Sequence, residues 1–473
     1  MIWLVLTRFI IGILVFCLSF IWILRIYLRH LKKQHHKEIP GTTIGIFHPY
    51  CNAGGGGERV LWCAVRAIQE GYRNRNVSII IYTGDHVPPE TLISNAEKRF
   101  NVIIEKSIKF EYLQRRRWVE AAKYPILTLL GQSLGSFLLG FEALFLHVPD
   151  VYIDTMGYAF TFPLFKVLGG AKIGCYVHYP TISTDMLARV AINLPAYNNS
   201  GAIARSRNLS SLKLGYYKLF AILYGFVGRF ADIVMVNSSW TENHINSIWN
   251  ISLRTNRVYP PCDVSEFLKI KQIPDSEKRI KSIVAVAQFR PEKDHPLMIM
   301  SYFSLLQVIP DELKERVRFI FVGSCRDEID EKRVEDYKDL CKHLSIEDYV
   351  EFRVNVTFEE LKTILQEGTI GIHTMWNEHF GISVVECMAA GLIMVAHNSG
   401  GPKSDIIVNS GHVRNGFLAE YEDEYSSTIL KILNMSDAER QEIREAAWSS
   451  VGRFSDAKFQ EDFLRNIAVL LET

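Results

Sequence analysis

The sequence predicts an α/β protein in which two doubly wound, parallel-sheet domains follow an N-terminal transmembrane helix. Three observations lead to this prediction: an apolar N-terminus, short β-branched runs that alternate with helical segments, and a proline break near residue 260 between two such series. A chain of 473 residues is too long for one hydrophobic core and is expected to form two or three domains.

The N-terminal segment is expected to cross a membrane. Phe9 to Leu24 carries no charged residue, and about 20 apolar residues span a bilayer. No small-residue cleavage site follows, and Arg25, Arg29 and Lys32 come directly afterwards, which favours a cytosolic location for the rest of the chain. The alternative is a cleaved signal and a lumenal protein with glycans at sequons such as Asn237-Ser238-Ser239. Asn237 ends a predicted buried strand, where a glycan would not fit, and this favours the cytosol.

The composition excludes several classes of function. Lys plus Arg (53) against Asp plus Glu (52) gives a formal charge of +1, whereas a nucleic-acid partner requires a basic surplus. The eight cysteines form no Cys-x-x-Cys pair, so a reducing compartment is favoured over a disulfide framework or a zinc site. No Asp-x-Asp motif occurs and the histidines lack paired ligand spacing, so no metal cofactor is expected.

Two series of strands predict the two domains. The first domain, residues 41–262, follows a signal-anchor and basic segment at 1–40; its helix 58–68 lies among strands predicted at 44–48, 77–82, 151–153, 173–178 and 233–236. The second domain, residues 263–473, has strands predicted at 283–287, 319–322, 350–352, 369–373 and 393–396. The sequence leaves open whether the last helix returns to the first domain.

Residues 126–148 allow two interpretations. They are apolar apart from Gln132 and Glu142, so they could form a second membrane helix. Glu142 and the nearby Asp150 favour a buried or interfacial helix instead, because a carboxylate is costly inside a bilayer.

An acidic pair marks the second domain. Glu378 and Glu386 lie eight positions apart, the first in a loop after strand 369–373 and the second in a predicted helix. Open parallel sheets bind ligands at the carboxyl ends of their strands, and a helix N-terminus there offers N–H groups to a phosphate. The loop around His379-Phe380-Gly381 is therefore predicted to pair an anion site with carboxylates suited to sugar hydroxyls.

A basic pair follows the first strand of the second domain. Arg290 supplies a planar fork of donors and Lys293 a point charge, a combination suited to a diphosphate. If a bond between phosphate and sugar breaks, these charges stabilise the leaving group. The alternative is a solvated surface pair, which the position at a strand end disfavours.

A glycine-rich loop follows the first strand of the first domain. Gly54, Gly55, Gly56 and Gly57 precede Glu58, and they match neither the phosphate-loop motif nor the dinucleotide fingerprint. Such a loop lets backbone amides approach a ligand closely, and the alternative is a flexible tight turn.

Two further side chains end strands of the first domain. His178 follows the strand 173–177 and is predicted to act near the reacting sugar, unless it is only a structural hydrogen-bonding group. Asp154 follows the strand 151–153, and it either holds a sugar hydroxyl or caps a turn. In the second domain, Gly400-Gly401-Pro402 is either a ligand loop or an ordinary turn.

These motifs together resemble the retaining glycosyltransferases of family 4, which have the GT-B fold of two Rossmann-like domains facing a cleft. The family signature Glu-x7-Glu is matched by Glu378 and Glu386, and its basic pair by Arg290 and Lys293. The resemblance extends from about Thr43 to the C-terminus. It implies that Glu378 lies by the donor sugar and that Glu386 binds the nucleotide ribose.

Residues 52–62, 176–180 and 376–381 resemble most closely the branch of this family that acts on dolichol-diphosphate-linked oligosaccharides. The resemblance implies a retaining α-1,2-mannosyltransferase that moves mannose from GDP-mannose to Man3GlcNAc2 and then Man4GlcNAc2, on the cytosolic face of the endoplasmic reticulum membrane, without a cofactor or nucleic-acid partner. It also admits other early N-glycan mannosyltransferases as partners.

The implied site residues fall into three groups. The catalytic candidates are Glu378, Lys293, Arg290 and His178. The donor-binding candidates are Arg290, Lys293, Glu378, His379, Phe380, Gly381, Glu386, Gly55 and Gly56, and the acceptor-side candidates are Gly54, Gly57, Glu58, Asp154 and His178.

Three other functions compete with this interpretation. The first is a lipid-directed member of the same family with a different donor or acceptor. The second is a non-catalytic, membrane-tethered nucleotide-sugar binder, which the intact basic and acidic pairs disfavour. The third is a nucleotide-sugar epimerase on the same fold, which would be soluble, so the N-terminal anchor disfavours it.

Overall fold

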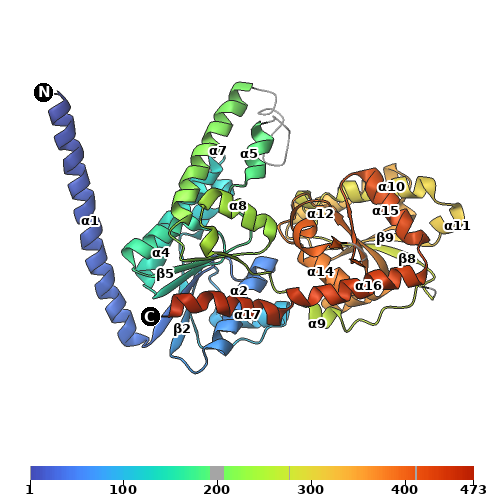
Figure 1. Cartoon of the computed structure of the whole chain (residues 1–473), viewed down its shortest axis with the longest axis horizontal. Helices are drawn as coiled ribbons and strands as arrows, with labels where there is room; N and C mark the ends of the chain where they lie inside the picture. The colour runs from blue at the N-terminus through green and yellow to red at the C-terminus, as the bar shows by residue number, and fades with distance from the viewer. Residues whose placement is uncertain (1, 192–206, 276, 411–412, 473) are drawn as a thin grey trace. The chain divides into compact units, whose positions relative to one another are not determined.

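The computed structural model describes residues 2–191, 207–275, 277–410 and 413–472. The chain divides into two compact units, each with its own parallel sheet (Figure 1). Unit 1 comprises Met1–Asn237, Thr241–Val258 and Gln460–Thr473, and unit 2 comprises Ser238–Trp240 and Tyr259–Phe459. The main division therefore falls after Val258, close to the proline break.

Unit 1 contains a sheet of seven strands in the order β3-β2-β1-β4-β5-β6-β7, counted over the described residues. All its pairings are parallel. The strands are β1 (Thr42–Phe47), β2 (Val77–Thr83), β3 (Ile108–Tyr112), β4 (Val151–Asp154), β5 (Lys172–Val177), β6 (Ile233–Val236) and β7 (Thr255–Arg257). The strand order reverses between β1 and β4, which is where an open sheet of this kind binds its ligand.

The helices of unit 1 connect these strands or flank them. They are α1 (Ile2–Glu38), α2 (Gly56–Gly71), α3 (Pro89–Phe100), α4 (Thr128–Leu146), α5 (Thr184–Ala191), α7 (Arg207–Gly228), α8 (Ser239–Trp249) and α17 (Asp456–Leu471), of which α8 and α17 have their first residues in unit 2. The central strands are buried because their side chains are apolar on both faces, and Ile46 and Ile153 have no exposed surface.

Unit 2 contains a parallel sheet in the order β10-β9-β8-β11-β12-β15, and its strand order reverses between β8 and β11. The strands are β8 (Lys281–Val286), β9 (Val317–Gly323), β10 (Val350–Val354), β11 (Gly368–His373), β12 (Ile393–His397) and β15 (Phe417–Ala419), and a short antiparallel pair is formed by β13 (Asn409–Ser410) and β14 (Val413–Arg414).

The helices of unit 2 cover both faces of that sheet. They are α9 (Val264–Phe267), α10 (His295–Val308), α11 (Asp311–Lys314), α12 (Glu328–His343), α13 (Phe358–Glu367), α14 (Ile382–Ala389), α15 (Glu422–Asn434) and α16 (Asp437–Val451). One apolar cluster includes α10 and α15, and a second includes α14 and residues of α16.

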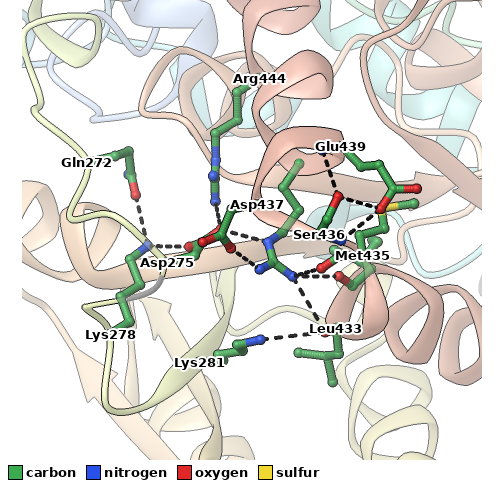
Figure 2. A network of polar contacts seen from close by, with 12 residues as sticks. Gln272, Asp275, Lys278, Lys281, Leu433, Met435, Ser436, Asp437, Glu439 and Arg444 are labelled. Carbon is green, nitrogen blue, oxygen red and sulfur yellow. Dashed lines mark hydrogen bonds and ion pairs between the residues drawn. The ribbon is translucent and has the colours of Figure 1, made fainter.

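A buried polar network joins the segment before β8 to α15 and α16 (Figure 2). Asp275 accepts a hydrogen bond from Nε of Arg440 at 2.8 Å and from a terminal nitrogen of Arg444 at 2.9 Å. Lys278 lies 3.4 Å from the other oxygen of Asp275, and burial lowers the pKa of this lysine to about 8. One carboxylate thus compensates cations that would be costly to bury alone.

The same network fixes two helix ends. Arg440 donates to the carbonyl of Met435 at 2.7 Å, just beyond α15. Arg444 donates to the carbonyl of Gly391 at 2.8 Å, just beyond α14. Arg440 also donates to the carbonyl of Ile432 in the last turn of α15 at 3.2 Å, and Arg444 holds the backbone just beyond the helix that carries Glu386.

Among the described residues, two helices are long and apolar enough to cross a membrane, in α1 (Ile11–Glu38) and in α4. Only 6% of the most apolar window of α1 is buried, against 39% for α4. Glu142 of α4 accepts hydrogen bonds from the backbone N–H groups of Gln114 and Arg115 at 2.7 and 3.2 Å. Because these hydrogen bonds connect α4 to the backbone of its own unit, the structure favours a buried or interfacial helix at residues 126–148 over a second membrane span.

The strands that the sequence analysis omitted lie at sheet edges. β3 alternates apolar and charged residues, β7 is Thr-Asn-Arg, and β15 has three residues. The helix expected at 58–68 begins earlier, at Gly56, because Gly55 adopts the extended backbone of an N-cap. Two of the four glycines therefore belong to the first turn of α2 rather than to the loop.

Candidate functional site

The loop that carries Glu378 connects β11 to α14 at the reversal point of the unit 2 sheet. Gly381 is the N-cap of α14 and has a φ of 109°, a left-handed conformation that favours glycine. Gly400 has a φ of 58°, and a Cβ built on it would lie 2.2 Å from the carbonyl oxygen of Glu378. The next glycine, Gly401, donates its N–H to that carbonyl at 2.7 Å. The Gly400-Gly401 turn thus fixes the backbone of Glu378.

The carboxylate of Glu378 is held at both oxygens. Lys293 forms an ion pair with Oε2, and Nε2 of His373 lies 3.1 Å from the same oxygen. Oε1 accepts the backbone N–H of His379 at 3.1 Å. Burial alone would raise the pKa of Glu378, but the Lys293 charge and the His373 hydrogen bond hold it well below its usual range. Glu378 is therefore ionised at neutral pH.

Lys293 reaches Glu378 because β8 and β11 are neighbouring parallel strands. The lysine lies in a single 3₁₀ turn, Pro291–Lys293, that follows β8. The hydroxyl of Thr374, just beyond β11, is 2.9 Å from the Lys293 carbonyl oxygen and 3.0 Å from that of Asp294. The ends of β8 and β11 are thus connected by hydrogen bonds to backbone carbonyls as well as by the ion pair between Lys293 and Glu378.

Arg290 and Glu386 occupy the positions expected from the sequence. Arg290 precedes the 3₁₀ turn as its N-cap and is half-buried. Glu386 lies inside α14 and is also half-buried. His379, Phe380 and Gly381 complete the loop, and of these Phe380 is buried in the apolar cluster that includes α14.

The glycine-rich loop of unit 1 is anchored at both ends. The backbone N–H of Asn52 donates to Asp85 at 2.9 Å, and the backbone N–H of Gly55 donates to Oε2 of Glu58 at 2.7 Å. Gly54 is exposed between these anchors. Gly56 and Gly57 form the first turn of α2, where backbone N–H groups have no partner within the helix.

His48, which the sequence did not single out, supports this loop through its contact with Glu58. His48 follows β1 and has no exposed surface. Its Nδ1 lies 2.7 Å from the hydroxyl of Thr155 and its Nε2 lies 3.4 Å from Glu58. Burial would raise the pKa of Glu58, but the contacts with His48 and with the Gly55 N–H lower it. The only sequence signal was the position of His48 at the end of the first predicted strand.

His178 lies beside the glycine-rich turn. A Cβ built on Gly57 would be 3.7 Å from Nε2 of His178. The ring of His178 lies 4.8 Å from that of Tyr176, and its carbonyl accepts a hydrogen bond from the side chain of Asn237 at 2.9 Å. The structure therefore brings His178 and the glycine-rich segment together, as expected.

Asp154 serves the turn after β4. Its carboxylate accepts backbone N–H groups from Met156, Gly157 and Tyr158 at 3.2, 2.8 and 2.9 Å, and the residue has no exposed surface. Burial raises the pKa of Asp154 to about 7, although the three N–H groups favour the ionised form. These three contacts match the turn cap, which is one of the two roles expected for Asp154.

No group of three or more His, Cys, Asp or Glu side chains in the described ranges is arranged to hold a metal ion. Arg290, Lys293 and Glu378 follow strand ends of unit 2 and Glu386 lies in α14, and together they are a set that suits a nucleotide sugar. Two doubly wound parallel sheets, with such a site at the reversal point of the second, define the class as glycosyltransferases of the GT-B fold.

Comparison with known families identifies the family within this class. Residues 41–249 match the family model described as ALG11 mannosyltransferase N-terminus, and residues 266–449 match the model of glycosyl transferases group 1. Together with curated relatives that are 50% identical over nearly the whole chain, these matches show that the chain belongs to the ALG11 mannosyltransferase family.

Several curated relatives have the same description, GDP-Man:Man(3)GlcNAc(2)-PP-Dol alpha-1,2-mannosyltransferase. The chain is 50% identical to the Mus musculus protein over 95% of its own length and 92% of that of the relative. It is 50% identical to the Homo sapiens protein, covering 98% and 94% of the two chains, and 43% identical to the Dictyostelium discoideum protein, covering 93% and 87%.

Solved structures support the fold. The sucrose-phosphate synthase from Thermosynechococcus elongatus superposes with a TM-score of 0.62 at 14% identity, covering 91% of this chain and 99% of that chain. A glycosyltransferase from Rickettsia africae superposes with a TM-score of 0.60 at 16% identity, covering 92% and 100%. At such low identity the likeness shows the fold alone.

Proposed function

We propose that this protein is a retaining α-1,2-mannosyltransferase that moves mannose from GDP-mannose to dolichol-diphosphate-linked Man3GlcNAc2 and then to Man4GlcNAc2. The observation that carries the proposal is the ion pair between Lys293 and Glu378 at the reversal point of the unit 2 sheet. The activity described for relatives at 50% identity agrees with it.

In this proposal unit 2 binds the donor. Lys293 and Arg290 stabilise the diphosphate leaving group, because a point charge and a planar fork of donors can share its oxygens. Glu378 holds a hydroxyl of the mannose, and Glu386 holds the ribose from within α14. The loop of His379, Phe380 and Gly381 lies between the two carboxylates and places the α14 N-terminus near the diphosphate.

Unit 1 contributes the glycine-rich segment and His178 in this proposal. Gly54 and Gly57, with Glu58 next to them in sequence, shape the acceptor side, and Gly55 and Gly56 let the loop backbone approach the donor while the Gly55 N–H stays bonded to Glu58. His178 lies next to Gly57 and acts close to the reacting sugar. Glu58 acts through the loop, since its carboxylate is bonded to Gly55 and to His48.

The reaction proceeds by attack of the acceptor 2-hydroxyl on the face from which GDP departs, so the α configuration is kept. The acceptor proton passes to a diphosphate oxygen, and the new glycosidic bond replaces the bond between mannose and phosphate. Glu378 and Glu386 are not assigned as the nucleophile and acid/base pair of retaining hydrolases. No metal ion is required in this proposal, so transfer in excess EDTA should equal transfer without it.

The proposed location is the endoplasmic reticulum membrane, with α1 as a single span and both units in the cytosol. Arg25, Arg29 and Lys32 at the end of the apolar run support this orientation. The burial of Asn237 also supports it, because its amide donates to the His178 carbonyl and accepts from Thr241 at 2.6 Å, which leaves no room for a glycan. Other early N-glycan mannosyltransferases are proposed as neighbours on this membrane.

One assay tests the function directly. Purified full-length protein is incubated with GDP-mannose and a lipid-linked trimannosyl acceptor, and the product is digested with an α-1,2-specific mannosidase. The expected product carries two added mannoses, both released by that enzyme. Transfer from UDP-glucose or UDP-N-acetylglucosamine in parallel reactions, with none from GDP-mannose, would refute the donor assignment. Glu386→Ala should mainly raise the Kd for GDP-mannose.

A further inference from the structure

His373 is the buried histidine at the end of β11, the strand beside the reversal point of unit 2. Its side chain is 2% exposed, and its Nε2 lies 3.1 Å from Oε2 of Glu378. The carbonyl of His373 accepts the hydroxyl hydrogen of Tyr425 at 2.9 Å, so the backbone behind the ring is also fixed. No sequence motif pointed to this residue.

The bond to Glu378 determines which ring nitrogen carries the proton. An ionised carboxylate only accepts hydrogen bonds, so Nε2 of His373 must be the donor. Burial and the charge of Lys293 lower the pKa of His373, which keeps the ring neutral at pH 7 with its single proton on Nε2. Within the described part of the chain, Nδ1 has no hydrogen-bond partner, which agrees with an unprotonated Nδ1.

Lys293 and His373 share one oxygen of Glu378. A donor diphosphate competes for Lys293, because its two phosphates together carry two negative charges and attract the ammonium more strongly than one carboxylate does. Once the lysine turns to the diphosphate, the side-chain contact left on Glu378 among those described is His373, together with the backbone N–H of His379. His373 can therefore hold the orientation of the Glu378 carboxylate while Lys293 binds the diphosphate instead.

We propose that His373 is a positioning residue that keeps the Glu378 carboxylate oriented toward the donor sugar when Lys293 moves to the diphosphate. The inference rests on the proposed function, because it assigns Glu378 to the sugar and Lys293 to the leaving group. It predicts that His373 contributes to the orientation of the mannose of the donor and does not contribute to the affinity for GDP.

The test compares two substitutions in the full-length protein. His373→Gln keeps an N–H donor for Glu378, whereas His373→Leu is similar in size and has none. Calorimetry measures the Kd for GDP-mannose and for GDP, and initial rates give kcat and KM. His373→Leu should lower kcat/KM roughly 10- to 100-fold, the usual effect of losing one hydrogen bond to a charged group. Its Kd for GDP should stay within about twofold, and His373→Gln should recover most of the loss.

Two outcomes would overturn the inference. One is full activity of His373→Leu, and the other is an equal loss of affinity for GDP and GDP-mannose, which indicates a general loosening of the site. If His373→Leu does not fold, His373→Phe serves as the donorless variant under the same criteria.

A double-mutant cycle separates this inference from the proposed function. If the two side chains act as a unit, His373→Leu changes the free energy of unfolding less in a Glu378→Ala background than in the wild type. Additive changes would contradict the positioning role whether or not mannose is transferred. Failure of the wild type to transfer mannose, with the coupling intact, would instead contradict the proposed function alone.

Discussion

Three carboxylates lie at or after the carboxyl ends of parallel strands but have different partners: Asp154 ends β4, Glu58 lies in the first turn of α2, and Glu378 lies in the loop after β11. Asp154 accepts three backbone N–H groups and Glu58 accepts the N–H of Gly55. Glu378 is held mainly by the side chains of Lys293 and His373. The carboxylates of unit 1 shape loops, whereas that of unit 2 is part of a cluster of charges. The difference is that backbone N–H groups are the main partners of Asp154, that Glu58 adds only the His48 side chain at 3.4 Å, and that charged side chains hold Glu378.

The largest effect is expected from removing charge in unit 2. Glu378→Ala and Lys293→Ala should each lower kcat about 100- to 1,000-fold, because Glu378 orients the donor sugar and Lys293 stabilises the leaving diphosphate in this proposal. Initial rates with GDP-mannose measure the loss, and thermal unfolding checks the fold. The matched control is Glu335→Ala or Lys338→Ala, which breaks a surface Lys–Glu pair on α12 and should leave the rate unchanged. Near-normal rates in both site variants would disprove the charge assignment.

The next largest effect is expected on stability, from removing the unit 1 carboxylate of Asp154. Asp154→Ala removes the acceptor of three backbone N–H groups, so it should destabilise the protein by about 3 kcal/mol. Denaturant unfolding measures the change. We expect the KM for the lipid-linked acceptor to stay constant in the folded fraction. A stable variant with a raised acceptor KM would instead support the acceptor role of Asp154.

The pH dependence of stability also distinguishes these carboxylates. Burial raises the pKa of folded Asp154 to about 7, above that of an unfolded aspartate, so the folded state holds this proton more tightly. Its contribution to stability is full below about pH 4 and is lost as the pH rises through about 7. Wild type should therefore lose stability relative to Asp154→Asn between pH 4 and 7. A flat difference across that window would show that the three N–H groups outweigh burial.

The smallest effect tests why the turn contains glycines. Gly57 lies in the first turn of α2, and an added Cβ would be at an ordinary contact distance of 3.7 Å from His178. Gly57→Ala should therefore stabilise the protein by about 0.5–1 kcal/mol, since glycine is unfavourable in a helix. If the turn contacts a substrate, transfer should fall while the unfolding midpoint rises. Unchanged transfer would indicate that Gly57 serves the helix start alone.

The sequence was sufficient to predict the central strands and the strand-to-helix position of Glu378, because their signals are local: buried apolar runs and a glycine before a helix. It did not reveal β3, β7 or β15, because edge strands bury little and carry polar residues.

The roles of His48 and His373 were also not predictable from the sequence, and the reason is a different one. His48 meets Thr155 across 107 positions, and His373 acts with Lys293 from another strand. Such contacts depend on sheet order, and a lone histidine at the end of a strand carries no signal of its partner.

The last helix has a consequence for how the chain is made. Within unit 1, Leu464 of α17 packs against Gly71 and Leu470 against Gly174, while Gln460 donates to Glu70 at 2.6 Å. The residues of α17 thus cover parts of unit 1 that are synthesised before unit 2. During translation, unit 2 can complete its core while unit 1 still lacks part of its covering layer. Unit 1 is therefore expected to reach its final form only after unit 2 has been synthesised and α17 has followed it.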